Sequence, residues 1–209
     1  MRAIEILTKA AYKPELFNLA AQIAHGKTLL VGEGNLSFSL SIVGKNVVKP
    51  HLISATTIET PERLSAITIE NSRALKKIGV RVMHGVDATK LSQRFGTEKF
   101  DSIIFQFPHT GTRTPSEHKN PNFILVRDFL RSAKRQLTAR GKVIISAVDN
   151  PHYRGAFQFE EAARITGFKS PEIYAFNPLS FAGYIHSMTL EDSSAIDAHK
   201  NFASWVFRL

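Results

Sequence analysis

Short apolar runs alternate along this chain with longer segments in which apolar residues recur every three or four positions. The apolar runs predict strands over residues 28–31, 51–58, 80–84, 100–107 and 142–148. The helical spacing predicts helices over residues 14–24, 36–43, 61–78, 120–139 and 156–165. Strands that alternate with helices in this way form a mostly parallel α/β sheet with helices on both faces.

The end of the chain departs from this alternation. Residues 183–190 and 203–209 each predict a strand, and no helical segment of comparable strength separates them. Two such strands joined by a loop would pair as a hairpin, which places one antiparallel strand in an otherwise parallel sheet. The sequence therefore predicts seven strands in a single Rossmann-like domain over residues 1–209, with residues 1–26 as a helical N-terminal extension.

A glycine-rich turn follows the first predicted strand and leads directly into a predicted helix, in the stretch Leu30-Val31-Gly32-Glu33-Gly34-Asn35-Leu36-Ser37. The two glycines allow unusual backbone angles and let a ligand lie against the backbone. Such a turn, with the helix N-terminus behind it, holds a mononucleotide-like cofactor in doubly wound sheets. We expect five residues to bind it: Gly32, Glu33, Gly34, Asn35 and Ser37. The alternative is a plain strand–helix turn, because Ser37 stands where the dinucleotide-binding pattern has its third glycine.

Two carboxylates follow the neighbouring predicted strands. Glu59 comes directly after the second strand, where a carboxylate can accept both hydroxyls of a ribose. Asp87 follows the third strand and can accept a hydrogen bond from an adenine amino group while Val86 or Ala88 packs on the ring. Each has a structural alternative: Glu59 as a solvated side chain near a helix N-terminus, and Asp87 as a helix cap.

The fourth predicted strand ends in Gln106-Phe107-Pro108-His109. The carboxyl ends of parallel strands face the ligand crevice, so this tetrapeptide is expected to lie where cofactor and substrate meet. An amide side chain can donate to and accept from the edge of a planar base, and aromatic and proline rings offer a stacking surface. Imidazole moves protons near neutral pH. Gln106, Pro108 and His109 are therefore candidate catalytic residues, the alternative being that His109 only turns the chain.

Charge adds information about the partner. Lys and Arg number 27 against 18 Asp and Glu, which gives a net charge of +9 and a pI near 9.9. This balance is expected of a protein that meets phosphate backbones, so we expect a nucleic acid partner. The basic residues are spread along the chain. One helical face with Arg127, Arg131, Lys134 and Arg135 is more typical of a solubilising surface than of a binding patch.

The composition excludes several other chemistries. The chain has no cysteine, and none of its eight histidines has a His, Asp or Glu at a recognised metal-ligand spacing. It has no Gly-x-Ser-x-Gly elbow of the serine hydrolase kind. No apolar run approaches the roughly 20 residues that cross a bilayer, and the first residues lack a signal-peptide pattern. We therefore expect a cytoplasmic protein without a metal or a membrane partner.

Four stretches together resemble the Rossmann-like domain of the eukaryotic 25S ribosomal RNA uridine-N3-methyltransferase family. They are residues 30–40, 55–59, 84–89 and 100–111, with weaker matches at 151–153 and 183–186. The most specific motifs are Gly-Glu-Gly-Asn-x-Ser-Phe-Ser at 32–39 and Phe-Pro-His-x-Gly at 107–111. The resemblance implies the class I methyltransferase fold, S-adenosylmethionine as cofactor, and methyl transfer to a ring nitrogen of a base in RNA, here uridine N3 in ribosomal RNA.

Three positions depart from these patterns. Gln106 stands where the family usually has Asn, which makes the expected base contact one methylene longer. Glu59 stands where the family usually has Asp, which keeps the carboxylate. Leu30 stands where many methyltransferases carry an acid, two residues before the first glycine, so Glu33 is expected to take over a polar contact to the cofactor.

On the expected activity, His109 accepts the N3 proton of uridine while Gln106 holds the edge of the base. Three other functions stay open from sequence. The first is methyl transfer to another acceptor, such as an exocyclic amine or a small molecule. The second is a nicotinamide-dependent oxidoreductase, which the missing third glycine and the terminal strand pair disfavour. The third is a noncatalytic RNA-binding module with the same fold.

Overall fold

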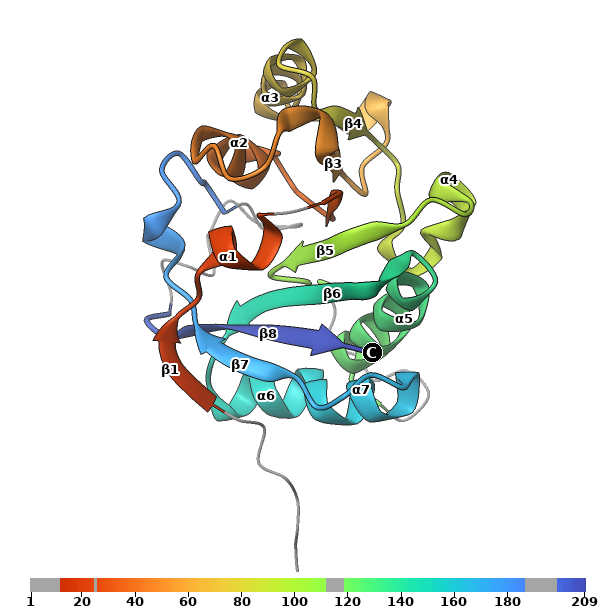
Figure 1. Cartoon of the computed structure of the whole chain (residues 1–209), viewed down its shortest axis with the longest axis vertical. Coiled ribbons are helices and arrows are strands. Elements are labelled where there is room, and N and C mark those ends of the chain that lie inside the picture. Colours follow the sequence, from red (N-terminus) through yellow and green to blue (C-terminus); the bar gives the residue numbers. More distant parts are fainter. Residues whose placement is uncertain (1–11, 25, 112–118, 187–198) are drawn as a thin grey trace, which may run out of the picture.

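The computed structural model describes residues 12–24, 26–111, 119–186 and 199–209 (Figure 1). Its eight strands are β1 (Tyr12–Leu16), β2 (Thr28–Val31), β3 (Ile53–Thr56), β4 (Arg81–Met83), β5 (Phe100–Gln106), β6 (Leu137–Val148), β7 (Glu172–Ala175) and β8 (Phe202–Arg208). Its α-helices are α1 (Leu19–Ile23), α2 (Ser37–Gly44), α3 (Ala66–Lys77), α4 (Ser92–Phe95), α5 (Pro121–Lys134), α6 (Pro151–Phe157) and α7 (Phe159–Thr166). Four short 3₁₀ turns are η1 (Pro50–Leu52), η2 (Pro61–Arg63), η3 (Ala88–Lys90) and η4 (Pro178–Ser180).

All eight strands belong to one sheet, in the spatial order β1-β7-β8-β6-β5-β2-β3-β4. β8 runs antiparallel to both of its neighbours, β6 and β7, and the other pairs are parallel. The expected mostly parallel sheet of seven strands with an antiparallel C-terminal strand is confirmed by β2 to β8. β1 adds an eighth strand at the edge, beside β7.

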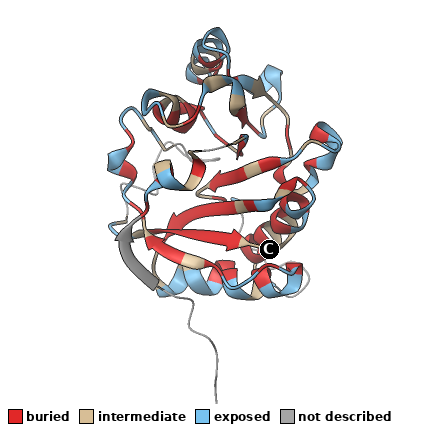
Figure 2. Ribbon diagram, in the orientation of Figure 1, coloured by how far each residue is buried: buried red, intermediate tan, exposed pale blue. Residues whose placement is uncertain are grey.

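Helices cover both faces of this sheet, and each face has its own apolar core. On one face α5, α6 and α7 bury side chains such as Phe129, Phe159 and Trp205. On the other face α1, α2 and α3 bury Ile23, Phe38, Leu75 and their neighbours. The central strands are buried along most of their length (Figure 2). Burial on both faces explains why these strands are continuous apolar runs in the sequence.

The N-terminal part differs from the expected helix over residues 14–24. Residues 12–16 instead form β1, whose backbone pairs with β7 through Tyr12 opposite Ile173 and Leu16 opposite Ala175. The helix α1 begins only at Leu19, after Asn18, whose side chain accepts a hydrogen bond from the Ala21 amide. Pairing with a distant strand thus outweighs the local helical spacing.

The hairpin expected at the C-terminus is wrong in its first strand. β8 pairs with β7, which is formed by residues 172–175, and residues 183–186 form no strand. Residues 187–190 of the expected strand lie outside the described residues. The antiparallel pair is nevertheless present, because β7 precedes β8 without an intervening α-helix in the described chain.

Three helix boundaries also differ. α5 ends at Lys134 rather than near residue 139, because Leu137 already belongs to β6 and pairs with Phe100. α3 begins at Ala66 with Ser65 as its cap, while residues 61–63 form only the turn η2. The helix expected over 156–165 is two helices, α6 and α7, separated at Gln158 by a left-handed backbone conformation.

The strand order places the candidate site. β2 lies between β3 and β5, so the chain leaves β2 toward one side of the sheet and later returns on the other. Such a reversal point is where doubly wound sheets bind ligands, beyond the carboxyl ends of the strands. Val31, the last residue of β2, is in register with Phe105 of β5. The glycine turn and Gln106 therefore start from neighbouring positions.

Candidate functional site

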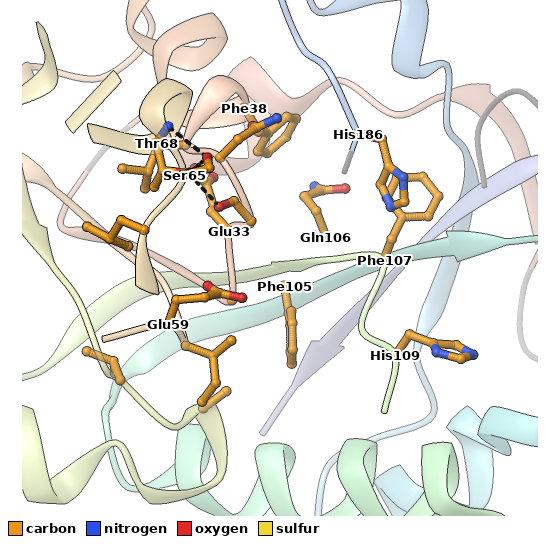
Figure 3. Close-up of a pocket in the computed structure, with 18 of the residues that line it drawn as sticks. Glu33, Phe38, Glu59, Ser65, Thr68, Phe105, Gln106, Phe107, His109 and His186 are labelled. Carbon is orange, nitrogen blue, oxygen red and sulfur yellow. Dashed lines mark hydrogen bonds between the residues drawn. The ribbon is translucent and has the colours of Figure 1, made fainter. Parts of the chain in front are cut away.

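One cavity of about 590 Å³ lies at the carboxyl ends of β2, β3, β4 and β5. Small-molecule sites typically measure roughly 300–1,000 Å³. Nine of the eleven candidate residues line it: Gly32, Glu33, Gly34, Asn35, Glu59, Asp87, Ala88, Gln106 and His109. Ser37 and Pro108 are not among the lining residues. The glycine turn and the end of β5 thus open onto the same space (Figure 3).

Gly32 meets two separate requirements of the turn. Its backbone φ is +63°, a conformation that residues with a Cβ adopt at a cost. A Cβ at this position would lie 2.5 Å from Cε2 of Phe105, which is far inside van der Waals contact. Phe105 is buried and packs edge-on against Phe129, so it forms a fixed neighbour of the turn. The turn therefore needs glycine both for its conformation and for the space it leaves.

Side chains of α3 hold the backbone of the turn from outside. The Thr68 hydroxyl donates a hydrogen bond to the Gly34 carbonyl (3.2 Å), and the Asn71 amide group donates to the Asn35 carbonyl (2.7 Å). The Glu33 amide donates to a carbonyl at the end of β3 (2.9 Å). These bonds fix the turn from two neighbouring elements, and the sequence patterns gave no indication of the part played by α3.

Asn35 and Ser37 bind backbone groups of the chain itself. The Asn35 side chain donates to the Ile185 carbonyl (2.9 Å) and accepts from the Ser37 amide (3.0 Å). The Ser37 hydroxyl donates to the Ile185 carbonyl and accepts from the Ile185 amide, both at 3.0 Å. The two side chains thereby dock residues 181–186 onto the N-terminus of α2.

Residues 181–186 form a wall of the cavity that the residue patterns did not assign. Tyr184, Ile185 and His186 line the cavity. The Tyr184 ring packs edge-on against Phe38 with a centroid distance of 5.0 Å. This wall comes from a part of the chain about 150 residues beyond the turn. Its only indication in the sequence was the weaker family match at 183–186.

Glu33 is a buried acid with one oxygen bound and the other unbound. Its Oε2 accepts a hydrogen bond from the Ser39 amide in the first turn of α2 (3.2 Å). Its Oε1 is buried and has no hydrogen-bond partner among the described residues. Burial raises the pKa of Glu33 from 4.5 to about 7, although hydrogen bonds from Ser39 act in the opposite direction. Burial and the nearby charge of Glu33 also raise the pKa of the Tyr184 hydroxyl.

Glu33 is expected to make folding stability depend on pH. Because its pKa rises from 4.5 to about 7 on folding, its contribution to stability is complete below pH 4.5 and is lost as the pH rises to about 7. A shift of this size corresponds to up to about 3 kcal/mol. The free energy of unfolding of the ligand-free protein should therefore fall more steeply over this window than that of a Glu33→Gln variant. Denaturant titrations of both proteins at several pH values measure the difference, and parallel curves would contradict the expectation.

Glu59 lies on the cavity at the end of β3. Its Oε2 is buried and has no partner among the described residues. Its carbonyl accepts hydrogen bonds from the Gly85 amide (2.8 Å) and the Thr57 hydroxyl (3.0 Å). The loops after β3 and β4 are thus tied together, which fixes the backbone of Glu59 beside the cavity.

Asp87 serves as a cap, as its structural alternative predicts. Its Oδ1 accepts from the Thr89 amide (2.8 Å) and hydroxyl (2.7 Å), and Lys90 lies 3.4 Å from its Oδ2. Partial burial raises the pKa of Asp87, but the Thr89 hydrogen bonds and the Lys90 charge outweigh this and lower it overall. Asp87 also lines the cavity, beside Val86 and Ala88, so capping does not remove it from the site.

Gln106 ends β5 with both of its amide atoms, Oε1 and Nε2, buried and without a partner among the described residues. The next residue, Phe107, has a φ of +48°, and such a conformation costs a bulky residue about 1–3 kcal/mol. The Phe107 amide donates to the Ser146 carbonyl on β6 (2.8 Å), and its ring packs edge-on against His186 with a centroid distance of 4.9 Å. In Figure 3 Gln106 lies between Glu33 and the pair of Phe107 and His186. Strained backbone held at a cavity in this way is typical of functional sites.

His109 lines the cavity, but its ring is engaged. Its Nδ1 accepts a hydrogen bond from the Gly111 amide (2.9 Å). In the neutral ring the proton then sits on Nε2, so neither nitrogen offers a lone pair to a substrate. The ring also points away from Gln106 (Figure 3). To accept a proton, His109 must first exchange its bond to Gly111.

Residues 29–188 match the family model described as rRNA (uridine-N3-)-methyltransferase, BMT5-like, which is more than half of the chain. The chain belongs to this family. The architecture agrees, because the chain superposes on a precorrin-6y C5,15-methyltransferase of Geobacter metallireducens with a TM-score of 0.54. That match has 13% sequence identity and covers 97% of this chain and 94% of the other, so it shows the class I methyltransferase fold alone.

Two curated relatives are similar to this chain over more than three quarters of its length. The human ferredoxin-fold anticodon-binding domain-containing protein 1 is 30% identical over 176 residues, which is 78% of this chain and 28% of the human protein. The 25S rRNA (uridine(2634)-N(3))-methyltransferase of Saccharomyces cerevisiae is 23% identical over 220 residues, which is 77% of this chain and 65% of the yeast protein. This family member therefore spans less than two thirds of either relative.

Most of the basic side chains on α5 form ion pairs or hydrogen bonds with other residues of the chain. Arg127 and Arg131 both form ion pairs with Asp128, at 2.8 and 3.2 Å. Lys134 donates to the carbonyls of Thr166 and Gly167 (3.0 and 3.3 Å). These contacts support the interpretation of this face as ordinary surface.

Two features are absent from the described residues. No cluster of three or more His, Asp or Glu side chains there has the arrangement of a metal site. No helix in the same residues is long and apolar enough to span a membrane.

Proposed function

We propose that this chain is an S-adenosylmethionine-dependent RNA methyltransferase that methylates a base nitrogen, uridine N3, in ribosomal RNA. One observation carries the proposal. Among the described residues, eight buried polar side-chain atoms lack a partner, and four of them belong to Glu33, Glu59 and Gln106 around one cavity. Buried polar atoms without partners cost free energy, so a ligand that pairs with them is strongly favoured. The family match supplies the chemistry of that ligand.

The residues around the cavity fit S-adenosylmethionine. The glycine turn leaves its backbone open to a ligand, and the unpartnered Oε2 of Glu59 is suited to a ribose hydroxyl. Val86 and Ala88 offer an apolar surface for an adenine ring, with Asp87 beside them. When bound, the cofactor supplies an electrophilic methyl group. The role of the chain is to align the acceptor nitrogen with that group and to exclude competing positions.

Gln106 carries the acceptor side of the proposal. Its Nε2 can donate to a carbonyl oxygen of the uracil edge, which leaves N3 open to the methyl group, and both amide atoms of Gln106 are unpartnered among the described residues. Phe107 and His186 add an aromatic wall for the ring. A base within a duplex must be extruded to reach this pocket, or be unpaired already. His109 can take the N3 proton only after its Nδ1 releases the Gly111 amide.

Arg63 suits the approach of an RNA backbone. It is exposed at the rim of the cavity and pairs with no carboxylate of the described residues. A guanidinium in this position can contact a phosphate next to the extruded base. An exposed arginine here agrees with the net charge of +9. The arginines of α5, in contrast, form ion pairs with Asp128. The expected cytoplasmic location stays a prediction.

Transfer of a labelled methyl group onto RNA tests the proposal. The protein is incubated with methyl-labelled S-adenosylmethionine and unmodified ribosomal RNA transcripts, and the RNA is then digested to nucleosides. We expect the label in 3-methyluridine and in no other nucleoside. A synthetic RNA in which every uridine is replaced by 3-methyluridine is the control and should accept no label.

The same assay separates the alternatives. Label in a different nucleoside indicates methyl transfer to another acceptor. Binding of S-adenosylhomocysteine in calorimetry without any transfer to RNA or to small molecules contradicts the proposed reaction. Absence of cofactor binding combined with RNA binding favours a noncatalytic RNA-binding module.

A further inference from the structure

Glu33 occupies an unusual position for the acid of a cofactor turn. The residue two places before the first glycine, Leu30, is buried in the apolar core and offers no charge. Glu33 instead lies between the two glycines, 7% exposed, and lines the cavity. Among the described residues no Lys, Arg or His pairs with it. The turn thus contains a buried carboxylate without a counter-ion in the part of the chain that the structure describes.

The unpaired Oε1 of Glu33 indicates which kind of ligand group would pair with this carboxylate. Oε2 is already bound to the Ser39 amide, whereas Oε1 is a buried acceptor with no donor among the described residues. A buried carboxylate is stabilised most by a cation that also donates a hydrogen bond. S-adenosylmethionine carries two cationic centres at its amino-acid end. The ammonium has N–H donors, and the sulfonium has none.

Resting on the proposed function, we infer that Glu33 is the anion that binds the α-ammonium group of the cofactor's amino-acid end. Tyr184 lines this part of the cavity, and its ring packs on Phe38. Its hydroxyl lies near enough to Glu33 for the charge of Glu33 to raise its pKa. The bonds of Asn35 and Ser37 to Ile185 hold Tyr184 in place. Asn35 and Ser37 are therefore positioning residues for this subsite.

The inference is tested by binding three ligands to wild type and to Glu33→Gln in calorimetry. S-adenosylmethionine and S-adenosylhomocysteine both carry the ammonium group, and 5′-methylthioadenosine has the same adenosine without the amino acid. Loss of a charge-assisted hydrogen bond should weaken the first two ligands by about 10- to 100-fold. The affinity for 5′-methylthioadenosine should stay within about twofold.

Two variants serve as matched controls. Glu59→Gln removes a carboxylate from the same cavity at the proposed ribose contact, so it should weaken all three ligands alike. Glu62→Gln removes an exposed carboxylate that does not line the cavity and should weaken none. Melting curves of each variant confirm folding. If Glu33 had a purely structural role, Glu33→Gln would lower the melting temperature and would change the affinities for all three ligands alike.

A second measurement needs no substitution. The titratable or charged side chains lining the cavity are Glu33, Glu59, Arg63, Asp87, His109, Tyr184 and His186, and Tyr184 is the one that faces Glu33. With the pKa of Glu33 at about 7, about a tenth of the free protein carries this charge at pH 6. The affinity for S-adenosylhomocysteine should therefore rise by up to about tenfold from pH 6 to 8, and that for 5′-methylthioadenosine should not. Both ligands share the adenosine end, so a group that titrates beside adenosine changes both affinities alike and does not alter their ratio.

The possible results separate the inference from the proposed function. If wild type binds none of the three ligands, the proposed function fails. If wild type binds them and Glu33→Gln weakens only S-adenosylmethionine, Glu33 faces the sulfonium, and the inference is overturned. Equal affinities of wild type and Glu33→Gln for S-adenosylhomocysteine also overturn it, while the proposed function stands.

Discussion

A Gly32→Ala variant is expected to lose cofactor binding and to be destabilised by about 2–6 kcal/mol. The new Cβ would lie 2.5 Å from Phe105 Cε2, and the φ of +63° would strain any residue other than glycine. Strain of this kind costs about 1–3 kcal/mol, and overpacking against a fixed ring costs a similar amount. Phe105 is buried and packs edge-on against Phe129, so a shift of its ring would disturb that packing. Calorimetry with S-adenosylhomocysteine and a denaturant titration measure the two effects.

Gly44→Ala is the matched control for this variant. Gly44 ends α2, the helix that follows the same turn, and a Cβ there would meet no atom within 4 Å. Alanine in a helix is more stable than glycine by roughly 0.5–1 kcal/mol, so this variant should bind the cofactor as wild type does and unfold no earlier. Unchanged cofactor affinity in Gly32→Ala would show that the turn tolerates a side chain, and the proposed cofactor site would be wrong.

The sequence predicts the central strands well because their environment is uniform. β2 is recovered with its observed limits, and β5 to within one residue, since both are covered on each face and consist of apolar runs. The errors occur where a distant partner decides the structure. Residues 14–16 fall in the helix predicted over 14–24 but belong to β1, which pairs with β7, and Leu137 continues a helical pattern but pairs with Phe100. Local periodicity contains no information on such partners.

The candidate site is predictable for a related reason. Parallel strands bring their carboxyl ends to one edge, so Gly32, Glu59, Asp87 and Gln106 meet on one cavity although they span more than 70 residues of sequence. The wall at residues 181–186 follows no such rule, because it is docked by the side chains of Asn35 and Ser37. The sequence assigned these two residues to the cofactor. Asn35 lines the cavity, and the Asn35 amide nitrogen and the Ser37 hydroxyl bind Ile185.

The unpartnered atoms lie on both sides of the cavity. Glu33 and Glu59 follow β2 and β3, and Gln106 ends β5, so carboxylates gather at one side and an amide at the other. Carboxylates suit the ammonium and hydroxyl groups of the cofactor, and a neutral amide suits a carbonyl oxygen of the base edge next to the acceptor nitrogen. Changes at the two sides should therefore have separable effects on cofactor binding and on turnover.

Replacing Gln106 tests the acceptor side of this division. A Gln106→Leu side chain has a similar size but no hydrogen-bonding atoms, so the base edge is no longer held in line with the methyl group. We expect kcat for RNA methylation to fall by about 100- to 1,000-fold, as for the loss of an orienting donor in other active sites. The affinity for S-adenosylhomocysteine should stay within about twofold, because Gln106 belongs to the acceptor side. Single-turnover methylation and calorimetry on the same preparation measure both.

Gln106→Asn is the informative companion variant. It restores the residue usual in the family and keeps both amide atoms, one methylene further from the base. Since an amide can still pair with the base edge, this variant should retain far more turnover than Gln106→Leu and should direct the label to the same nucleoside. If Gln106→Leu methylates RNA at the wild-type rate, Gln106 does not hold the base, and its two unpartnered atoms must serve the cofactor instead. If Gln106→Asn moves the label to a different nucleoside, the length of this side chain selects the acceptor nitrogen.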